Sequence, residues 1–434
     1  MPEKQKINIL WYTKDLRTRD QESLYRIMQE DTPFLALYIF DEDFYREKQW
    51  GFRKCGRYRA KFLLETVRGL SSALKEKNIP FLVKYGKTES IFKELSEKYT
   101  VEKIFCQQEW TRDENETERR IKNVLPFTSW EKSYTQFLIS PDCTREYFAK
   151  VPIQFTAFRQ KLEKNFTVRE EFDSEHLTYN KSGPELHFTS DDVSLKSLGF
   201  DEFEPDSRTA FPFSGGERRA LERLSYYFSG SGKLDTYKAT RNGMKGTDYS
   251  SRFSAWLADG SLSAVTVYHE IKKYEARHGS SESSCWMVFE LLWRDFFRHT
   301  SLEYGDRIFH QRGINGKIYD YNPDPELIRQ WTEGETASGF INANMMELKH
   351  TGWMSNRGRQ NVASYFSKIL KQDWRIGAAY FEEMLIDYDV HSNYGNWMYL
   401  AGVGNDPRNR VFSPEKQAAQ YDPEQEFIQL WLNR

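Results

Sequence analysis

Residues 387–410 combine side chains that could bind a large polar ligand. Asp387 and Asp389 lie just ahead of Asn393, Asn396 and Trp397. Protein cores rarely carry carboxylates and carboxamides, and each such group that is buried needs a hydrogen-bonding partner. A planar ligand with donors and acceptors along one edge would supply these partners. The alternative is a structural loop that closes a helical domain.

A second polar stretch, residues 351–366, lies upstream of the first. It places Asn356, Arg357 and Arg359 at the head of a segment whose apolar residues recur with a helical period. Arg359 is therefore in a position to pair with Asp387 or Asp389 beside the same ligand.

Hydroxyl side chains gather before another apolar-periodic segment, within residues 237–263. Ser250, Ser251 and Ser254 surround Arg252 there. Free backbone N–H groups at a helix start attract anions, and hydroxyls and a guanidinium strengthen the attraction. This pattern indicates a phosphate site, although an ordinary helix-capping cluster would contain the same residues.

Residues 286–300 are apolar nearly all round, which predicts a buried helix. Glu290, Trp293, Arg294 and Phe297 fall on one side of that helix. A buried carboxyl among rings is costly unless it meets a ligand or a cation. Glu290 therefore either serves a ligand or pairs with Arg294 one turn later.

Several of these stretches resemble one known family. Residues 351–361 read TGWMSNRGRQN, and residues 392–408 read SNYGNWMYLAGVGNDPR. Both resemble motifs of the photolyase/cryptochrome family, and most closely those of its DASH branch. Residues 248–254 (DYSSRFS) and 11–20 (WYTKDLRTRD) are also similar to family motifs, so the resemblance covers nearly the whole chain.

The resemblance implies FAD as the cofactor. The contacts that it implies are Tyr237, Ser250, Ser251, Arg252, Phe253, Ser254, Arg359, Asp387, Tyr388, Asp389 and Asn393. The group around Arg252 matches contacts to the pyrophosphate. Asp387 and Asp389 match the acids at the flavin edge, and Asn393 matches the residue that faces flavin N5.

The resemblance also implies residues that contact damaged DNA. Glu290 matches the acid that hydrogen-bonds a cyclobutane pyrimidine dimer, Trp293 matches the ring that stacks on it, and Asn356 contacts the same lesion. Photolyases draw their target out of the helix, so an aromatic wall and a polar floor suit such a pocket.

Arg294, Arg357 and Tyr399 are the remaining DNA contacts that the resemblance implies. Tyr399 stands where duplex-repairing photolyases have a second stacking Trp, and Tyr is what DASH proteins show. Since a smaller ring stacks less strongly, we expect single-stranded DNA as the main substrate.

Trp397 and Trp374 match the first two members of the family's electron-transfer chain. The third member is usually Trp, but here Tyr321 stands near that place, with Tyr319 close by. A neutral Tyr gives up an electron readily only if its proton also leaves. The resemblance therefore implies slow or pH-dependent photoreduction through Tyr321 or Tyr319.

The reaction that we expect is light-driven repair of cyclobutane pyrimidine dimers by an electron from excited, fully reduced FAD. A blue-light photoreceptor with little or no repair activity is the main alternative. A six–four photoproduct lyase is disfavoured because Ser355 and Asn356 stand where its His pair would be. A flavin- or nucleotide-binding protein without light chemistry is the least specific alternative.

Two further features of the resemblance concern the antenna and a loop. Glu109 matches an acid that contacts a folate antenna such as methenyltetrahydrofolate in DASH proteins, although a solvated loop carboxylate would look the same. Residues 336–345 read TASGFINANM, and Asn342 stands where the family usually has Asp. This change puts the backbone contacts of that loop in doubt.

The composition sets limits on the function. The chain has 434 residues and a net charge of −2, so any DNA contact has to come from a local basic patch. The basic residues that would form it, if they cluster, are Lys233, Lys238, Arg241, Lys245, Arg252, Arg294, Arg298, Arg357 and Arg359. If they are scattered, they are ordinary solvated charges.

The four cysteines form no CxxC pair, which disfavours a metal site and fits a reducing cytoplasm. The chain starts with neither a signal nor a transit peptide, and it contains no apolar window of about twenty residues that would span a membrane. We expect a cytoplasmic monomer.

The pattern of elements predicts the fold class. Apolar runs of strand length lie at residues 7–12, 34–40, 80–84 and 102–106, with helical patterns such as 58–74 between them. This alternation predicts a doubly wound parallel sheet, although neither GxGxxG nor GxxxxGK[ST] is present. We expect an α/β antenna domain at 1–130, a connector at 131–212, and an all-helical FAD- and DNA-binding domain at 213–434.

Overall fold

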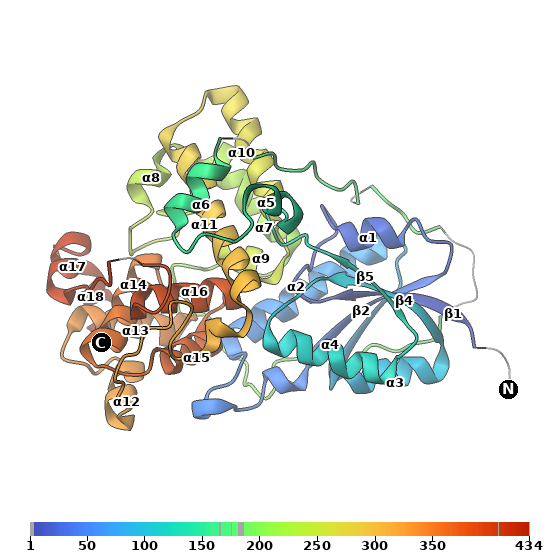
Figure 1. Cartoon of the computed structure of the whole chain (residues 1–434), viewed down its shortest axis with the longest axis horizontal. Helices are drawn as coiled ribbons and strands as arrows, with labels where there is room; N and C mark the ends of the chain where they lie inside the picture. The colour runs from blue at the N-terminus through green and yellow to red at the C-terminus, as the bar shows by residue number, and fades with distance from the viewer. Residues whose placement is uncertain (1–3, 165, 175, 181–185, 407, 434) are drawn as a thin grey trace.

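The computed structural model describes residues 4–433 except 165, 175, 181–185 and 407. An α/β unit and a helical unit lie side by side (Figure 1). The predicted fold class, an α/β domain followed by a helical domain, is confirmed. No helix in the described part of the chain has the length and apolar character that crossing a membrane requires.

Five parallel strands form one sheet among the described residues, in the order β3-β2-β1-β4-β5. They are β1 (Lys6–Tyr12), β2 (Phe34–Asp41), β3 (Phe81–Gly86), β4 (Thr100–Gln107) and β5 (Ser129–Ser133). The first four are the strands that the sequence predicts. The fifth has the mostly polar sequence SWEKS and lies at the sheet edge, so it lacks the apolar run on which a prediction depends.

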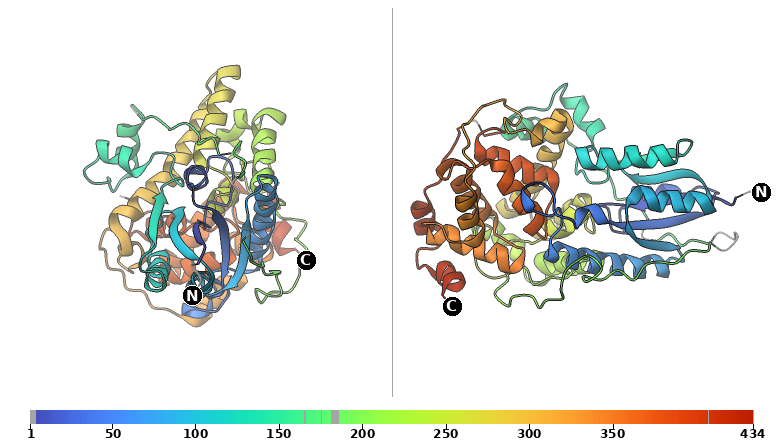
Figure 2. Two further views of the ribbon diagram at one scale, coloured as in Figure 1. Left: turned by 90° about the vertical axis from the view of Figure 1, so that its right-hand side faces the viewer. Right: turned by 90° about the horizontal axis from the view of Figure 1, so that it is seen from below.

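Helices cover both faces of the sheet (Figure 2). They are α1 (Glu22–Ile27), α2 (Arg57–Glu76), α3 (Thr88–Lys98) and α4 (Arg112–Val124). Because successive strand residues point to opposite faces, Ile7 and Ile9 share a core with α3 and α4, whereas Leu10 and Tyr12 share one with α1 and α2.

The strand order reverses at β1, which lies between β2 and β4. In open α/β sheets, ligands bind outside the carboxyl ends of the strands at such a reversal. Lys14 follows β1 and Glu109 follows β4, so the topology brings both residues to this point.

The helical unit contains most of the helices. They are α5 (Pro141–Tyr147), α6 (Phe155–Leu162), α7 (Glu217–Ser225), α8 (Tyr237–Thr240), α9 (Ser254–Asp259), α10 (Ala264–His278), α11 (Glu282–Tyr304), α12 (Pro325–Glu333), α13 (Gly339–Thr351), α14 (Asn356–Ser364), α15 (Trp374–Met384), α16 (Val390–Ala401), α17 (Pro414–Tyr421) and α18 (Glu426–Leu432). Short 3₁₀ or π turns are η1 (Glu42–Phe44), η2 (Gln49–Gly51), η3 (Tyr226–Gly230), η4 (Lys233–Thr236), η5 (Gly305–Phe309) and η6 (Tyr365–Ile369).

Helix α11 is the axis of the helical unit. A capping box formed by Ser281 and Ser284 starts it, and its residues from Asp295 to Ser301 are all buried. It packs against α6, α8, α10 and α16. The buried helix predicted for residues 286–300 is therefore confirmed.

The connector contains more regular structure than its sequence suggests. Strand β5 runs to Ser133, so a domain boundary at residue 130 would cut it. Within the expected connector, α5 (Pro141–Tyr147) and α6 (Phe155–Leu162) are both helical. Phe155 and Phe158 of α6 are buried in the core of the helical unit, which ties this part of the connector to α11.

Candidate functional site

Two ion pairs lie at the head of α16. Arg359 Nη2 lies 2.9 Å from Asp387 Oδ1, and Arg298 Nη2 lies 2.5 Å from Asp389 Oδ2. The pair of Arg359 with Asp387 is one of the two that the sequence predicts. Burial opposes ionisation of Asp389, but the charges of Arg298, His391 and Arg294 outweigh it and hold its pKa far below the usual range. Each aspartate thus faces a guanidinium group.

Sequence reasoning missed Arg298 as the partner of Asp389. The two residues lie far apart in the sequence, and only the packing of α11 on α16 joins them. A cation on a helix predicted to be buried was the available signal, because a buried charge needs a partner of opposite sign. Gly395 permits the close packing, since a Cβ there would lie 2.2 Å from the Phe297 ring.

Asn393 lies one turn into α16 and is buried. Its side-chain Nδ2 donates to the carbonyl oxygen of Ala378 on α15 at 3.0 Å. This bond fixes the orientation of the amide between two helices. The role facing flavin N5 remains a prediction.

The serine cluster lies in the loop before α9. Ser251, Arg252 and Phe253 are buried, Ser250 is partly exposed and Ser254 is exposed. The Arg252 guanidinium donates to the carbonyl oxygens of Ala210 and Gly246, at 2.9 and 2.8 Å. These two bonds order the loop, and the phosphate contact of Arg252 remains a prediction.

Glu290 does not pair with Arg294. Its Oε1 accepts from Arg241 Nη1 at 2.5 Å and from Trp286 Nε1 at 3.1 Å, and among the described residues nothing donates to Oε2. Burial raises the pKa of Glu290, and the Arg241 charge offsets only part of that rise. Tyr237 lies nearby and is buried, and burial, followed by the Glu290 charge, raises its pKa.

The Arg294 side chain turns inward, which corrects its predicted role in DNA binding. Its Nη1 donates to the carbonyl oxygen of Gln136 at 2.6 Å, and its Nη2 donates to that of Leu257 at 3.1 Å. The guanidinium thus joins α11 to the segment after β5 and to α9.

The basic residues do not gather into one free patch. Arg252, Arg294 and Arg298 are held inside the fold by the contacts described above. Lys238 forms an ion pair with Glu282, and Lys245 forms one with Glu426.

Asn356 and Arg357 begin α14, after the capping residue Ser355. The Asn356 side chain is exposed. Arg357 donates to Gln360 and Asn242, and its guanidinium lies over the Tyr421 ring. Both side chains are placed where a ligand could reach them from outside.

Trp293 and Tyr399 are brought together, as the resemblance implies. Their ring centroids lie 6.3 Å apart at 88°, and both residues are partly exposed. The Tyr399 hydroxyl accepts from Arg410 Nη2 at 2.8 Å. The two rings thus form an aromatic corner on the outer side of α11 and α16.

Sequence reasoning missed Phe155, which stacks flat on Trp293. The centroids lie 3.7 Å apart at 16°, and Phe155 is only 6% exposed. Removing a buried Phe side chain costs about 3–5 kcal/mol, whereas stacking of one base on a ring contributes about 1–3 kcal/mol. A docking base is therefore too weak to displace Phe155, which is a fixed part of the pocket wall.

The predicted electron-transfer residues lie in one core. Trp397 packs against α15 at Gly377, where a Cβ would lie 2.2 Å from its ring, and Trp374 lies one turn away on the same helix. Gln372, two residues before Trp374, accepts at its side-chain oxygen from the backbone N–H of Asp324 at 2.8 Å. That contact holds the segment that follows Tyr321 against the start of α15.

The two tyrosines have different surroundings. Burial, followed by the charge of Asp373, raises the pKa of Tyr321. The hydroxyl of Tyr319 instead donates to the carbonyl oxygen of Gly402 at 3.4 Å, near the end of α16. These contacts favour Tyr321 over Tyr319 as the neighbour of Trp374.

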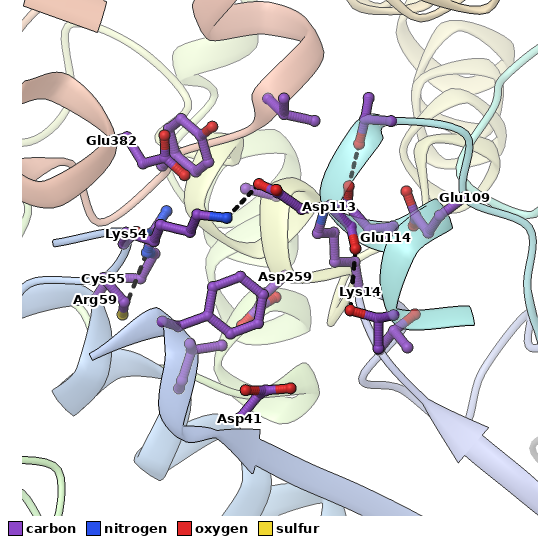
Figure 3. Close-up of a pocket in the computed structure, with 18 of the residues that line it drawn as sticks. Lys14, Asp41, Lys54, Cys55, Arg59, Glu109, Asp113, Glu114, Asp259 and Glu382 are labelled. Atoms are coloured by element: carbon purple, nitrogen blue, oxygen red, sulfur yellow. Dashed lines mark hydrogen bonds and ion pairs between the residues drawn. The ribbon is translucent and has the colours of Figure 1, made fainter. Parts of the chain in front are cut away.

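A cavity of about 420 Å³ lies between the two units. Figure 3 shows Lys14, Asp41 and Glu109 from the strand ends facing Arg59 and Glu382 across it. The cavity lies at the carboxyl ends of β1, β2 and β4, where a doubly wound sheet binds ligands.

Glu109 is one of the acids that line this cavity. Burial raises its pKa to about 7, even though the Lys14 charge opposes the rise. Lys14 instead pairs with Glu114, at 2.5 Å. Burial alone would raise the pKa of Glu114, but the charge of Lys14 outweighs it and lowers that pKa to about 2. Glu109 is therefore a partly exposed acid that lines the cavity, and its contact with a folate remains a prediction.

Tyr388 also lines this cavity, with the Arg59 guanidinium 4.6 Å from its ring centroid. It was predicted as an FAD contact together with Asp387 and Asp389. Its ring instead belongs to the inter-domain cavity, because neighbouring residues at the head of α16 point to different sides.

Asn342 makes the loop contacts that the departure from the family pattern put in doubt. Its Oδ1 accepts from the Thr336 N–H at 2.8 Å and from Thr336 Oγ1 at 2.6 Å. Its Nδ2 donates to the Thr336 carbonyl oxygen at 2.8 Å. An Asp could not make the last bond, so Asn suits this loop.

The residues around Arg359 fit a ligand rich in hydrogen-bond donors and acceptors, such as FAD. Glu347 is 1% exposed, and its Oε2 has no hydrogen-bond partner in the described chain. Burial raises its pKa to about 8, although Arg252 and Arg359 are close enough to lower it. Such an atom needs a donor, and a cofactor with hydroxyl and amide groups would supply one.

Comparison with known proteins agrees with this geometry. Residues 8–176 match the DNA photolyase family, and residues 286–434 match the FAD binding domain of DNA photolyase. Cryptochrome DASH of Xenopus laevis is 42% identical over 430 residues, which cover 96% of this chain and 81% of that protein. Cryptochrome DASH of Synechocystis sp. is 38% identical over 428 residues, which cover 98% and 87%.

Two solved structures are also similar. The cryptochrome of Synechocystis sp. PCC6803 superposes with a TM-score of 0.92 at 37% identity and covers 100% of this chain and 89% of that chain. A class III photolyase from Agrobacterium tumefaciens has a TM-score of 0.81 at 25% identity, with coverage of 99% and 87%. The chain belongs to the photolyase/cryptochrome family, in its cryptochrome DASH group.

Proposed function

We propose that this protein repairs cyclobutane pyrimidine dimers in single-stranded DNA with light and FAD. The observation that carries the proposal is the aromatic corner of Trp293 and Tyr399, with Trp293 on the helix that also carries the half-buried acid Glu290. Behind it, the ion pair of Arg298 with Asp389 joins the same helix α11 to α16.

Different residues of the chain would have separate roles in this reaction. When bound, FAD supplies an electron on absorbing light. Arg298 and Arg359 keep Asp389 and Asp387 in place, and α15 fixes the Asn393 amide that would face the flavin. The pyrimidine dimer, drawn out of the strand, would stack on Trp293, with Tyr399 at its edge.

Glu290 would hydrogen-bond the pyrimidine carbonyl oxygen. Burial raises its pKa, so the carboxyl keeps its proton to a higher pH than an exposed Glu, and a protonated Glu290 would donate at Oε2. A donor already in position stabilises negative charge as it develops on the base. Arg241 and Trp286 keep the carboxyl oriented through Oε1.

A direct experiment illuminates the purified, FAD-reduced protein with a single-stranded oligonucleotide that contains one thymine dimer. We expect loss of the dimer, measured by chromatography, and slower repair in the duplex. Glu290→Ala should lower the repair yield per photon more than it weakens binding, since removing one positioned donor costs roughly 10²–10³ in other enzymes. Glu282→Ala, at an exposed position of α11, is the control. No repair by the reduced wild-type protein would refute the proposal.

We extend the proposal to an antenna chromophore in the inter-domain cavity. Its volume of about 420 Å³ suits a compact polycyclic ligand. Glu109 would meet the N–H groups of a folate ring. An archaeal photolyase from Sulfolobus tokodaii was solved with two FAD molecules, so a flavin is the competing occupant. An absorption spectrum of the purified protein distinguishes the two chromophores.

Blue-light photoreception is the second candidate, favoured by the close packing of Trp397 on the helix that carries Trp374. Light-driven flavin reduction without repair would support it. Tyr321→Phe should then slow photoreduction, whereas Tyr319→Phe, the matched control, should leave it unchanged. Reduction at the wild-type rate in Tyr321→Phe would remove this residue from the route.

A further inference from the structure

We propose that Phe155 is a positioning residue that holds Trp293 in place for base stacking. The proposal rests on the function given above and deepens it, because it assigns part of the damage recognition to the connector. Phe155 itself is not required to touch the base. It acts through the ring of Trp293.

Phe155 stacks on one face of Trp293. The other rings near Trp293 do not lie flat against it: Phe297 is tilted by 37° and Tyr399 is perpendicular. Among the described residues, Phe155 is thus the ring that stacks on Trp293, at 16°. Since an indole has two faces, a base that stacks on Trp293 would have to use the face opposite Phe155.

Phe155 is itself held from several sides. Phe289 and Phe296, which flank Trp293 along α11, meet its ring edge-on at 5.2 and 5.5 Å. The backbone carbonyl oxygen of Ile153 accepts from Asn405 Nδ2 at 2.7 Å, which ties the start of α6 to the loop after α16. These contacts fix Phe155, and Phe155 in turn restricts rotation of the Trp293 ring.

A fixed Trp293 would favour binding of a damaged base. A side chain that is already ordered loses less conformational entropy when a ligand stacks on it. The opposite possibility is that Phe155 occupies the face that the base needs and has to leave. Its deep burial among rings argues against such a plug, because base stacking is too weak to pull it out.

The test measures the ratio of affinities for a thymine-dimer oligonucleotide and its undamaged counterpart, both single-stranded, by fluorescence anisotropy. Phe155→Leu removes the flat ring, and we expect the ratio to fall by about fivefold to tenfold, part of what one base stack can contribute. Phe155→Tyr keeps the ring and should keep the ratio. Phe158→Leu, a change to a fully buried ring on the same helix, is the matched control.

Each outcome decides the proposal. An unchanged ratio in Phe155→Leu, or tighter binding of damaged DNA, would overturn it, and tighter binding would indicate the plug. An equal fall in Phe158→Leu would also overturn it, because the effect would then be general loosening of α6. If Phe155→Leu does not fold, Phe155→Met repeats the test with a flexible side chain.

The control Trp293→Leu separates this inference from the proposed function. If Trp293→Leu leaves the ratio unchanged, the stacking role of Trp293 and the proposed function fail. If Trp293→Leu lowers the ratio and Phe155→Leu does not, only the role of Phe155 fails.

Discussion

Asp389 at the head of α16 differs in charge from Glu382 in the inter-domain cavity. Asp389 at the head of α16 meets Arg298 directly, and its pKa is held far below the usual range. Glu382 in the cavity lies near Arg59, yet burial raises its pKa to about 7. The Arg59 guanidinium donates instead to Cys55 Sγ and to the Lys54 carbonyl oxygen. A nearby cation is thus not enough to ionise a buried acid, because the guanidinium has to be free to bond it.

This difference suits two tasks. Permanent charges at the head of α16 create a constant field beside the site predicted for the flavin. Glu109 and Glu382 in the cavity can hold a proton, so they can donate to a ligand as well as accept from it. The proton content of the cavity depends on pH, while that of the Asp389 pair does not over the physiological range.

Breaking the Arg298 pair should have the largest effect. Arg298→Met leaves Asp389 buried without its partner, and loss of one member of a buried pair costs about 3–5 kcal/mol of the free energy of unfolding. Urea unfolding followed by circular dichroism measures the change. Arg329→Met, at an exposed residue paired with Glu326 and Glu335, is the control and should change nothing measurable. Equal stability of both variants would show that the buried pair of Arg298 with Asp389 contributes no more to stability than an exposed pair.

The difference between contacts within one motif and contacts between separate helices explains which parts of the site the sequence could predict. Arg359 and Asp387 lie in two motifs rich in polar residues, so their pairing was one of the two predicted. The four apolar strands were predicted from their composition. Arg298 with Asp389, and Arg241 with Glu290, join residues that only the packing of separate helices brings together.

Phe155 was missed for a similar reason. It lies in a connector that is poor in periodic pattern, so its sequence does not indicate that it stacks on a ring of α11. Positions on one helix or in one motif were accessible to sequence reasoning. Contacts that depend on the angle between elements were not.

Glu347 tests whether every buried acid near the head of α16 is ionised. It lies in the helical unit, yet burial raises its pKa to about 8. Its folded-state pKa exceeds the unfolded value, so its stabilising contribution is complete below about pH 4.5 and is lost as the pH rises through 8. Glu347→Gln should therefore flatten the fall of melting temperature between pH 5 and pH 8. A variant profile parallel to that of the wild type would show that Glu347 is ionised by a partner.

Replacing Glu109 should change the pH dependence of the melting temperature in the same direction as replacing Glu347. The change should cover a narrower pH range and be smaller. Its pKa is raised to about 7, so the stability that protonated Glu109 provides is present below about pH 4.5 and is lost as the pH rises through 7, with no further loss up to pH 8. Glu109→Gln should flatten the profile of melting temperature below pH 7 only, whereas the effect of Glu347→Gln continues to pH 8. Glu97→Gln, at an exposed position of α3, is the control. If Glu109→Gln instead makes the fall steeper, Glu109 is held as an anion by Lys14, and the two groups of acids do not differ in the way the contacts indicate.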